Sequence, residues 1–214
     1  MAGSNEIPNR PDWWGDDLSG GQAVPGAGPN SFPVDPNDPA FQPPPLEMDP
    51  STMGASDKLK DYLRAREVYK DHIYNDNPQH PENGTRTIGY GHTGNVDAIA
   101  SRYPQGLPRE VAQSILDADM APAEQIVRKH LKVPVTQGQF DALVDYAFNA
   151  GPGAFLSSPM LSHLNGGDAA SAAKDFGTAR ITQKGVLVRG LQNRRADETG
   201  MFQTGDAVNK YGPR

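Results

Sequence analysis

Glu67, Asp76 and Thr87 have the residue types and the order that acid–base hydrolysis would need. Asp76 lies nine residues after Glu67, and Thr87 lies eleven residues after Asp76. Hydrolysis of a glycoside requires a carboxylic acid that protonates the leaving oxygen. It also requires a second carboxylate, on the opposite side of the sugar ring, that acts on a water or as the nucleophile. Acids at this spacing are common in soluble proteins, and Asp71 and Glu82 are rivals nearby, so the spacing by itself does not establish catalysis.

The segment that carries these residues is predicted to be a helix followed by a small hairpin. Ser56 is suited to cap a helix that continues to about Glu67 with apolar residues on one face. Between roughly 72 and 95 the helical pattern stops, and HIYND and TRTIGYGHTG have the character of short strands separated by turn residues. A helix end and a facing hairpin can hold two carboxylates across a cleft.

The rest of the chain is predicted to be mainly helical. Apolar residues recur at helical spacing from about 108 to 131, and Pro122 is expected to kink or split that helix. Thr136 and Gln139 form a capping box that opens the next helix, and Gly151 closes it. Further helices are predicted at about 159–165, 168–176 and 189–203, the middle one capped by Asp168. The fold class is therefore α+β, mostly helical, with one small hairpin or meander.

Composition and residue spacing exclude several kinds of functional site and segment. The 214 residues include no cysteine, which excludes disulfides, thiolate metal sites and a cysteine nucleophile. The five histidines are scattered without ligand spacing, so no metal is expected. No run of about 18 apolar residues occurs, and the first residues lack the basic and apolar parts of a secretory leader. The sequence therefore predicts no membrane segment and no export signal.

Residues 1–50 differ in composition from the rest of the chain and are predicted to be an extended acidic arm. Residues 51–214 are then predicted to be the folded domain. The arm holds 11 of the 20 prolines and a net charge of −7, so the remainder carries +1 of the total of −6. Such a stretch cannot supply a core, and a nearly neutral body gives no support to nucleic-acid binding. The tandem Trp13-Trp14 is either an anchor for a partner protein or a local apolar cluster.

The segment REVYKDHIYNDNPQHPENGTRTIGYGH resembles the catalytic signature of the phage-type lysozymes, glycoside hydrolase family 24. In that family a helix-terminal Glu precedes a Tyr-x-Asp strand, a Gly-x-x-Thr turn and the motif T-I-G-Y-G-H. VPVTQGQFDALVDYAFNAGPGAF, LSHLNGGD and GLQNRRADETGMF are similar to its carboxy-terminal lobe, so the resemblance covers about 56–203. The matching positions of the signature are Glu67, Tyr74, Asp76, Gly84, Thr87, Ile88, Gly89, Tyr90, Gly91 and His92.

The chain departs from the family pattern in three places. The stretch from Asp76 to Thr87 is five residues longer, and we expect the hairpin loop to absorb the insertion while the strands keep their register. Val68 stands where a Gly commonly follows the acid. A Trp common after the helix near 176 is replaced around Ala179-Arg180, which puts the packing of the last hairpin in doubt.

The resemblance implies a role for each matching residue. Glu67 would be the general acid and Asp76 the base that orients the attacking water, with Thr87 making the second hydrogen bond to that water. Gly89, Tyr90 and Gly91 would bind substrate, because glycine lets a sugar approach the backbone closely. A tight bend or bulge is the alternative explanation for the two glycines.

Two further pairs are assigned on the same basis. His92 and Asp119 would form a structural pair between the hairpin and the following helix. Arg194 and Arg195 would bind substrate carboxylates or pair with acids near the cleft, and a solvated helix face is the alternative for both.

The fold implied by the resemblance has two lobes, a small one with the hairpin and a larger helical one, joined by a long helix with the cleft between them. The implied reaction is cleavage of the β-1,4 bond between N-acetylmuramic acid and N-acetylglucosamine in peptidoglycan, with inversion at the anomeric carbon and with no organic cofactor. The setting would be a phage endolysin, in the host cytoplasm until released to the wall, or a virion-associated lysozyme. The alternatives are a particle component that docks through residues 1–50 and mainly binds glycan or protein, and a bacterial toxin effector.

Overall fold

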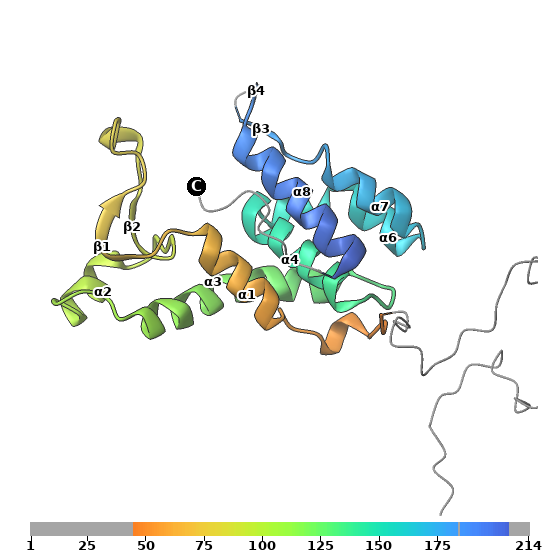
Figure 1. Ribbon diagram of the computed structural model, residues 1–214, viewed down its shortest axis with the longest axis horizontal. Helices are drawn as coiled ribbons and strands as arrows, with labels where there is room; N and C mark the ends of the chain where they lie inside the picture. The colour runs from red at the N-terminus through yellow and green to blue at the C-terminus, as the bar shows by residue number, and fades with distance from the viewer. Residues whose placement is uncertain (1–44, 184, 206–214) are drawn as a thin grey trace, which may run out of the picture. The chain divides into compact units, whose positions relative to one another are not determined.

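The computed structural model describes residues 45–183 and 185–205 (Figure 1). The chain divides into two units, residues 1–44 and residues 45–214, and only the second contains described residues. The predicted arm and Trp13-Trp14 therefore lie outside the described residues, apart from 45–50. In the described part no helix is both long and apolar enough to cross a membrane.

The first elements of the folded unit form a small lobe around a two-stranded sheet. Helix α1 (Asp57–Arg66) leads into strand β1 (Lys70–Asn75), which pairs antiparallel with β2 (Arg86–Gly89) before the short helix α2 (Val96–Arg102). Ser56 caps α1 as predicted, because its Oγ accepts a hydrogen bond from the backbone N–H of Leu59 at 3.2 Å. Tyr74 lies opposite Thr87 in the ladder, so the insertion is confined to the loop.

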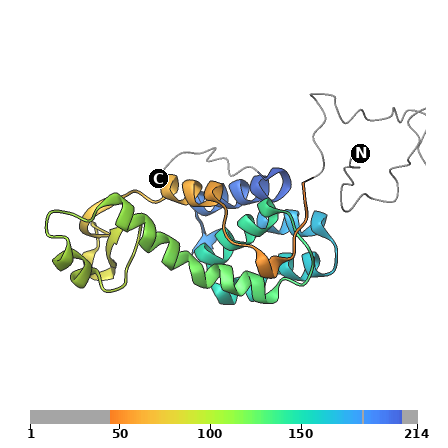
Figure 2. The same cartoon turned by 90° about the horizontal axis from the view of Figure 1, so that it is seen from below.

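Helix α3 (Arg109–His130) connects this lobe to the remaining helices (Figure 2). It is one continuous helix of 22 residues although Pro122 lies inside it, so the predicted split does not occur. Met120, Ala123 and Val127 are buried on its inner face, and packing of that face against α4 compensates for the hydrogen bond that proline cannot donate.

The helical lobe is built around α4 (Gln137–Ala150), which packs against α3, α5 and α8. Thr136 caps it with the predicted capping box, and Gly151 ends it with φ of 87°. Burying large side chains such as Phe140 and Leu143 stabilises the lobe by about 1.5–3 kcal/mol each. The surrounding helices are α5 (Pro152–Leu156), α6 (Pro159–Asn165), α7 (Ala169–Phe176) and α8 (Arg189–Thr204).

A second hairpin, β3 (Thr182–Gln183) and β4 (Val186–Leu187), precedes α8. It forms without the tryptophan that the family pattern would place nearby, and Arg180 before it adopts φ of 50°. Val186 and Leu187 remain largely exposed on this hairpin. The hairpin is therefore paired, but its apolar residues Val186 and Leu187 contribute little burial.

The segment before α1 packs on the helical lobe, so the folded unit begins earlier than the predicted boundary at Ser51. Met48 exchanges two backbone hydrogen bonds with Val135, at 2.8 and 3.0 Å. Pro50, in the short 3-10 helix η1 (Pro50–Thr52), is buried. The carbonyl of Met53 accepts a hydrogen bond from Arg128 of α3 at 2.8 Å.

The residues just before α1 are tied to α4 as well. The carbonyl of Gly54 accepts from Gln137 at 2.9 Å, and the backbone N–H of Ser56 donates to buried Asp141 at 3.0 Å. Burial raises the pKa of Asp141, although its hydrogen bonds from Ser56 oppose that shift. Together these contacts fix the start of α1, and hence the helix that ends at Glu67, to the larger lobe.

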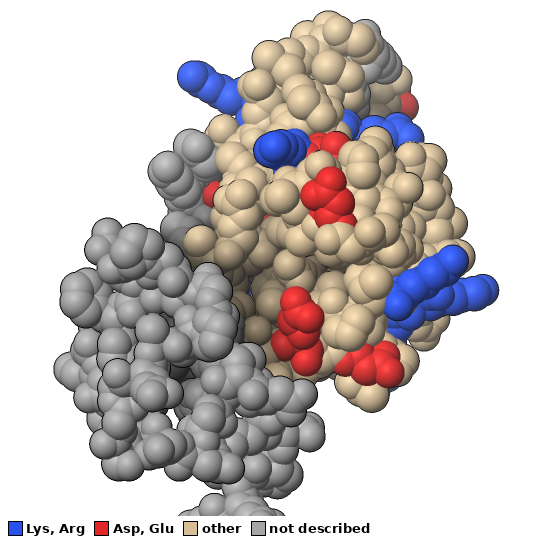
Figure 3. Space-filling view, turned by 90° about the vertical axis from the view of Figure 1, so that its right-hand side faces the viewer, with Lys and Arg blue, Asp and Glu red and all other residues tan. Residues whose placement is uncertain are grey.

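The surface seen in Figure 3 carries acidic and basic side chains in separate small groups rather than one basic stripe. Nucleic-acid binding usually requires such a stripe. No such stripe is seen among the residues drawn in colour on this face.

Candidate active site

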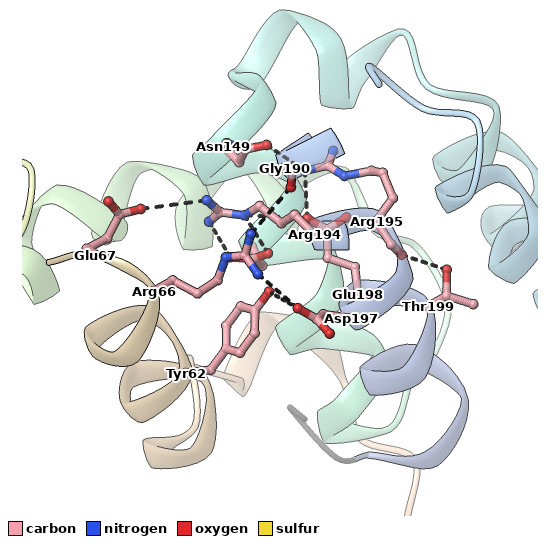
Figure 4. A network of polar contacts seen from close by, with 11 residues as sticks. Tyr62, Arg66, Glu67, Asn149, Gly190, Arg194, Arg195, Asp197, Glu198 and Thr199 are labelled. Carbon is pink, nitrogen blue, oxygen red and sulfur yellow. Dashed lines mark hydrogen bonds and ion pairs between the residues drawn. The ribbon is translucent and has the colours of Figure 1, made fainter. Parts of the chain in front are cut away.

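Glu67 lies at the carboxyl end of α1, where the helical backbone stops. Its own N–H still bonds to Leu63 O at 2.9 Å, but its φ and ψ of −85° and 114° are extended. The side chain is 34% exposed, and Oε1 lies 3.7 Å from Nη1 of Arg194 (Figure 4). A Cβ placed on Gly91 would lie 3.6 Å from Oε2. The carboxyl group therefore stands between α8 and the turn after β2, reachable from solvent.

Asp76 lies one residue beyond β1 and is exposed. Its backbone N–H donates to Thr85 O at 3.1 Å, and its Oδ1 accepts the backbone N–H of Thr85 at 2.6 Å. Oδ2 accepts no hydrogen bond from the residues that the structure describes. One oxygen is thus anchored to the opposite side of the loop, and the other is available to a water.

Tyr74 and Thr87 form the directly opposed pair of the hairpin, and opposed side chains share one face of a sheet. Thr87 is buried, and its Oγ1 donates to Thr85 O at 3.0 Å, which leaves the hydroxyl oxygen as an acceptor. Burial raises the pKa of Tyr74, and the charges of Glu67 and Asp76 raise it further. The charges of both carboxylates therefore act on Tyr74, a residue that the sequence analysis placed in the motif without a role.

A buried ionic network lies behind Glu67. Arg194 binds Asp145 with two hydrogen bonds, Nε to Oδ2 at 3.0 Å and Nη2 to Oδ1 at 2.6 Å. Its Nε also lies 3.8 Å from Glu198, which pairs with Arg195 at 2.8 Å (Figure 4). This bidentate geometry fixes the guanidinium group that faces Glu67.

The charges in this network affect one another strongly because Asp145 and Glu198 are fully buried. Burial opposes ionisation of Asp145, but the charge and hydrogen bonds of Arg194 outweigh it and hold the pKa of Asp145 below its ordinary value. Burial, followed by repulsion from Asp145, raises the pKa of Glu198 well above its ordinary value. Asp145 is therefore the charged partner of Arg194.

A second buried group ties α1 to α8. Asp197 accepts hydrogen bonds at Oδ2 from Arg66 at 2.9 Å and from the hydroxyl of Tyr62 at 3.2 Å. Arg66 immediately precedes Glu67, so the end of α1 and the helix that carries Arg194 are joined. The sequence analysis missed Asp145, Asp197 and Glu198. Only Glu198 had a local signal, because it lies at the apolar spacing of α8, seven residues after Leu191 and four before Phe202. Asp145 and Asp197 lie off that spacing in their helices.

The structure corrects part of the predicted substrate-binding set. Tyr90 is 5% exposed, packs on Tyr69 and accepts a hydrogen bond from Arg109, and Arg195 is fully buried. Neither side chain is accessible to a substrate, because each is enclosed by its own packing partners. Arg194 and Arg195 pair with acids, so the alternative of a solvated helix face is wrong for both.

The two glycines of the motif differ in surroundings. Gly89 is buried with φ of 67°, and a Cβ there would lie 3.2 Å from Leu107 and 3.3 Å from Ala112, so it serves a tight bend against α3. Gly91, with φ of 84°, is exposed beside Glu67. Only Gly91 offers its backbone to a ligand at the acid.

His92 and Asp119 are in contact between the turn after β2 and helix α3. The Nδ1 atom of His92 lies 2.8 and 3.0 Å from the two carboxylate oxygens of Asp119. Both side chains are partly exposed and line, with Gly91, Thr93, Gly94 and Phe148, a hollow of about 360 Å³. This pair joins the hairpin region to the connecting helix and borders the Glu67 site. Among the described residues, no group of three or more His, Asp or Glu could hold a metal ion.

Solved structures define the class of fold. The chain is similar to the muramidase domain of SpmX from Asticaccaulis excentricus, with 28% identity and a TM-score of 0.58 over 71% of this chain and 98% of that one. It is also similar to an endolysin from Escherichia coli O157:H7 phage FAHEc1, with 29% identity and a TM-score of 0.60 over 72% and 96%. The fold is that of the lysozyme-like muramidases, as the sequence predicted.

The family follows from the sequence comparison. The Phage lysozyme family model matches residues 64–198, and the chain belongs to this family. An endolysin of Bacillus phage PZA is 42% identical over 128 residues, which cover 58% of this chain and 46% of that protein. An endolysin of Bacillus phage B103 is 41% identical, with 45% of its length covered. The chain thus spans about half the length of these two curated relatives.

Proposed function

We propose that the protein is a muramidase that hydrolyses the β-1,4 bond between N-acetylmuramic acid and N-acetylglucosamine in peptidoglycan. The observation that carries the proposal is the partly exposed Glu67 carboxyl at the end of α1, which lies beside Arg194 and Gly91. The names of its relatives, endolysins and a muramidase domain, support the same activity.

In the proposed reaction Glu67 donates its proton to the glycosidic oxygen as the bond from that oxygen to the anomeric carbon breaks. A water held by the free Oδ2 of Asp76 attacks the anomeric carbon from the other side and gives its proton to Asp76. Thr87 has already donated its hydroxyl hydrogen to Thr85, so it contributes an acceptor to the water. The product is an inverted sugar, and the two carboxyl groups should be about 6.5–9.5 Å apart to leave room for water.

Arg194 has a positioning role in this reaction. Its 3.7 Å distance from Glu67 is an ion-pair contact and too long for a hydrogen bond, whereas its two bonds to Asp145 are short. The guanidinium therefore belongs mainly to Asp145, and Glu67 keeps the freedom to exchange a proton with substrate.

The chemistry of the products tests the proposal. Purified chain incubated with peptidoglycan should release muropeptides with reducing N-acetylmuramic acid ends, and NMR recorded at early times should show the α anomer first. Products with anhydro ends, or none above those of Glu67→Gln, would reject the muramidase. The β anomer first would reject only the inversion.

The biological setting is a separate proposal: a phage endolysin held in the host cytoplasm until release, or a virion-associated lysozyme. The second candidate, a particle component that docks through residues 1–50, rests on the −7 charge and 11 prolines of that stretch. Deleting residues 1–44 should leave hydrolysis at the wild-type rate. If the truncated chain also keeps its association with virion proteins in co-sedimentation, docking through this stretch is wrong, whereas loss of that association alone would favour it.

A further inference from the structure

The loop that carries Asp76 is organised by one side chain, the carboxamide of Asn75. Its Oδ1 accepts the backbone N–H of Asn77 at 2.8 Å, and its Nδ2 donates to the carbonyl of Pro81 at 3.1 Å. The two partners belong to opposite sides of the loop at the upper left of Figure 1. One half-buried amide therefore clamps the ascending and descending parts of the loop together.

The loop above this clamp has its own hydrogen bonds. The N–H of His80 donates to Asn77 O at 3.2 Å, that of Asn83 to His80 O at 2.9 Å, and that of Gly84 to Pro81 O at 3.2 Å. The last two close the 3-10 turn η2 (Pro81–Asn83). A loop five residues longer than the family pattern has more conformational freedom to lose, and these bonds offset that cost.

Gly84 is the second half of the clamp. A Cβ at this position would collide with Oδ1 of Asn75 and lie 3.0 Å from its Nδ2. The backbone of Gly84, with φ of −97° and ψ of 164°, is accessible to every residue type, so glycine is needed here for space and not for conformation. A methyl group could be fitted only by displacing an amide that makes two hydrogen bonds.

The clamp formed by Asn75 and Gly84 lies directly beside the hydrogen bond between Asp76 and Thr85. Asn75 precedes Asp76 and Gly84 precedes Thr85, whose N–H holds Oδ1 of Asp76 at 2.6 Å. We propose that Asn75 is a positioning residue for hydrolysis, whose carboxamide, packed on Gly84, sets the placement of Thr85 relative to Asp76 and thereby aims the free oxygen of Asp76. This role rests on the proposed muramidase activity.

Four variants test it in a kinetic cycle. Asn75→Ala removes the two hydrogen bonds, and Gly84→Ala pushes the amide away, so each should lower kcat about 10- to 100-fold while KM changes less than about twofold. In the double variant there is no amide for the added methyl group to displace. The kcat of the double variant should therefore equal that of Asn75→Ala, and should not fall by the product of the two single-variant factors. Gln79→Ala, an exposed residue of the same loop, is the matched control and should keep wild-type kcat.

Hydrogen exchange gives a readout independent of activity. The amide of Thr85 should exchange faster in both single variants, while thermal unfolding stays within a few degrees of wild type because the loop is exposed. Wild-type kcat in Asn75→Ala, losses that multiply in the double variant, or an effect on KM alone would overturn the role. If the wild-type chain cleaves no peptidoglycan, the proposed function fails and this role with it, whereas faster Thr85 exchange would still show that the clamp orders the loop.

Discussion

The two carboxyl groups of the site are held by different kinds of structure. Glu67 is backed by charges buried among α1, α4 and α8, where Asp145, Arg194 and Glu198 are almost completely removed from water. Asp76 stands on an exposed hairpin loop, anchored by the Thr85 N–H and by the carboxamide that packs on Gly84. Removing one partner of a buried ionic network strongly lowers the free energy of unfolding. A hydrogen-bonded surface loop, in contrast, can open locally at a small cost in free energy. The placement of Glu67 therefore depends on interactions that stabilise the whole helical lobe, whereas the placement of Asp76 depends on the hydrogen bonds of its own loop.

The largest expected effect is on turnover and comes from the acid itself. Glu67→Gln keeps the shape of the side chain but removes the transferable proton, so kcat should fall by about 10²- to 10⁴-fold. Glu82→Gln, at an exposed acid of the hairpin loop, is the control and should have wild-type kcat. Thermal unfolding of Glu67→Gln should match wild type; full activity would remove Glu67 from the mechanism.

The next largest effect is on the free energy of unfolding and comes from the buried ionic network behind Glu67. Asp145→Ala leaves the guanidinium of Arg194 buried without its bidentate partner, which should lower the free energy of unfolding by about 3–5 kcal/mol. Urea denaturation measures it. A loss below about 1 kcal/mol would mean that Arg194 finds water or Glu67 instead, and the acid would then not depend on the network.

A pH dependence follows from Glu198, whose pKa is raised in the folded state by burial and by Asp145. A carboxyl group with a raised folded pKa stabilises the fold fully below its unfolded pKa, near 4.5, and this contribution is lost as pH rises through the folded value. In Glu198→Gln this loss should be absent, so the difference in unfolding free energy between variant and wild type should grow in favour of the variant from about pH 4.5 upward. A constant difference between pH 4 and 8 would contradict the raised pKa.

The smallest effect is expected on the exposed side. Arg86 and Asp97 form a bidentate pair at 2.6 Å, but both side chains are more than half exposed, so water and salt screen their attraction. Asp97→Ala should change neither the unfolding midpoint in urea nor kcat measurably. A large destabilisation would show that the hairpin, too, depends on its charges.

The sequence predicted the elements that have local signals. Ser56, Thr136 and Asp168 cap their helices because each carries a short side-chain oxygen at the right place before an apolar pattern. The helix at 96–102 was not predicted, because its Asn95 cap is in the left-handed region and makes no side-chain hydrogen bond. The split expected at Pro122 does not occur, because packing with α4 outweighs the local rule against an internal proline.

The candidate site was predictable only where its motif is contiguous. Glu67, Asp76 and Thr87 stand in one signature, but Asp145 reaches Arg194 from 49 residues away and carries no local mark of that contact. Arg195 and Tyr90 were assigned to substrate because neither charge nor aromatic character reveals burial in a sequence. Spacing identifies residues on one element, and the partners contributed by other elements appear only in three dimensions.

The attachment of Met48 to Val135 has a mechanical consequence. A pull on the chain ahead of Met48 would act first on the two backbone bonds to Val135, and next on the contacts of Met53 and Gly54 with Arg128 and Gln137. Only after these had broken in turn would tension reach α1. A force applied on the amino-terminal side would therefore be borne by these contacts and would leave the position of Glu67, at the end of that helix, unchanged.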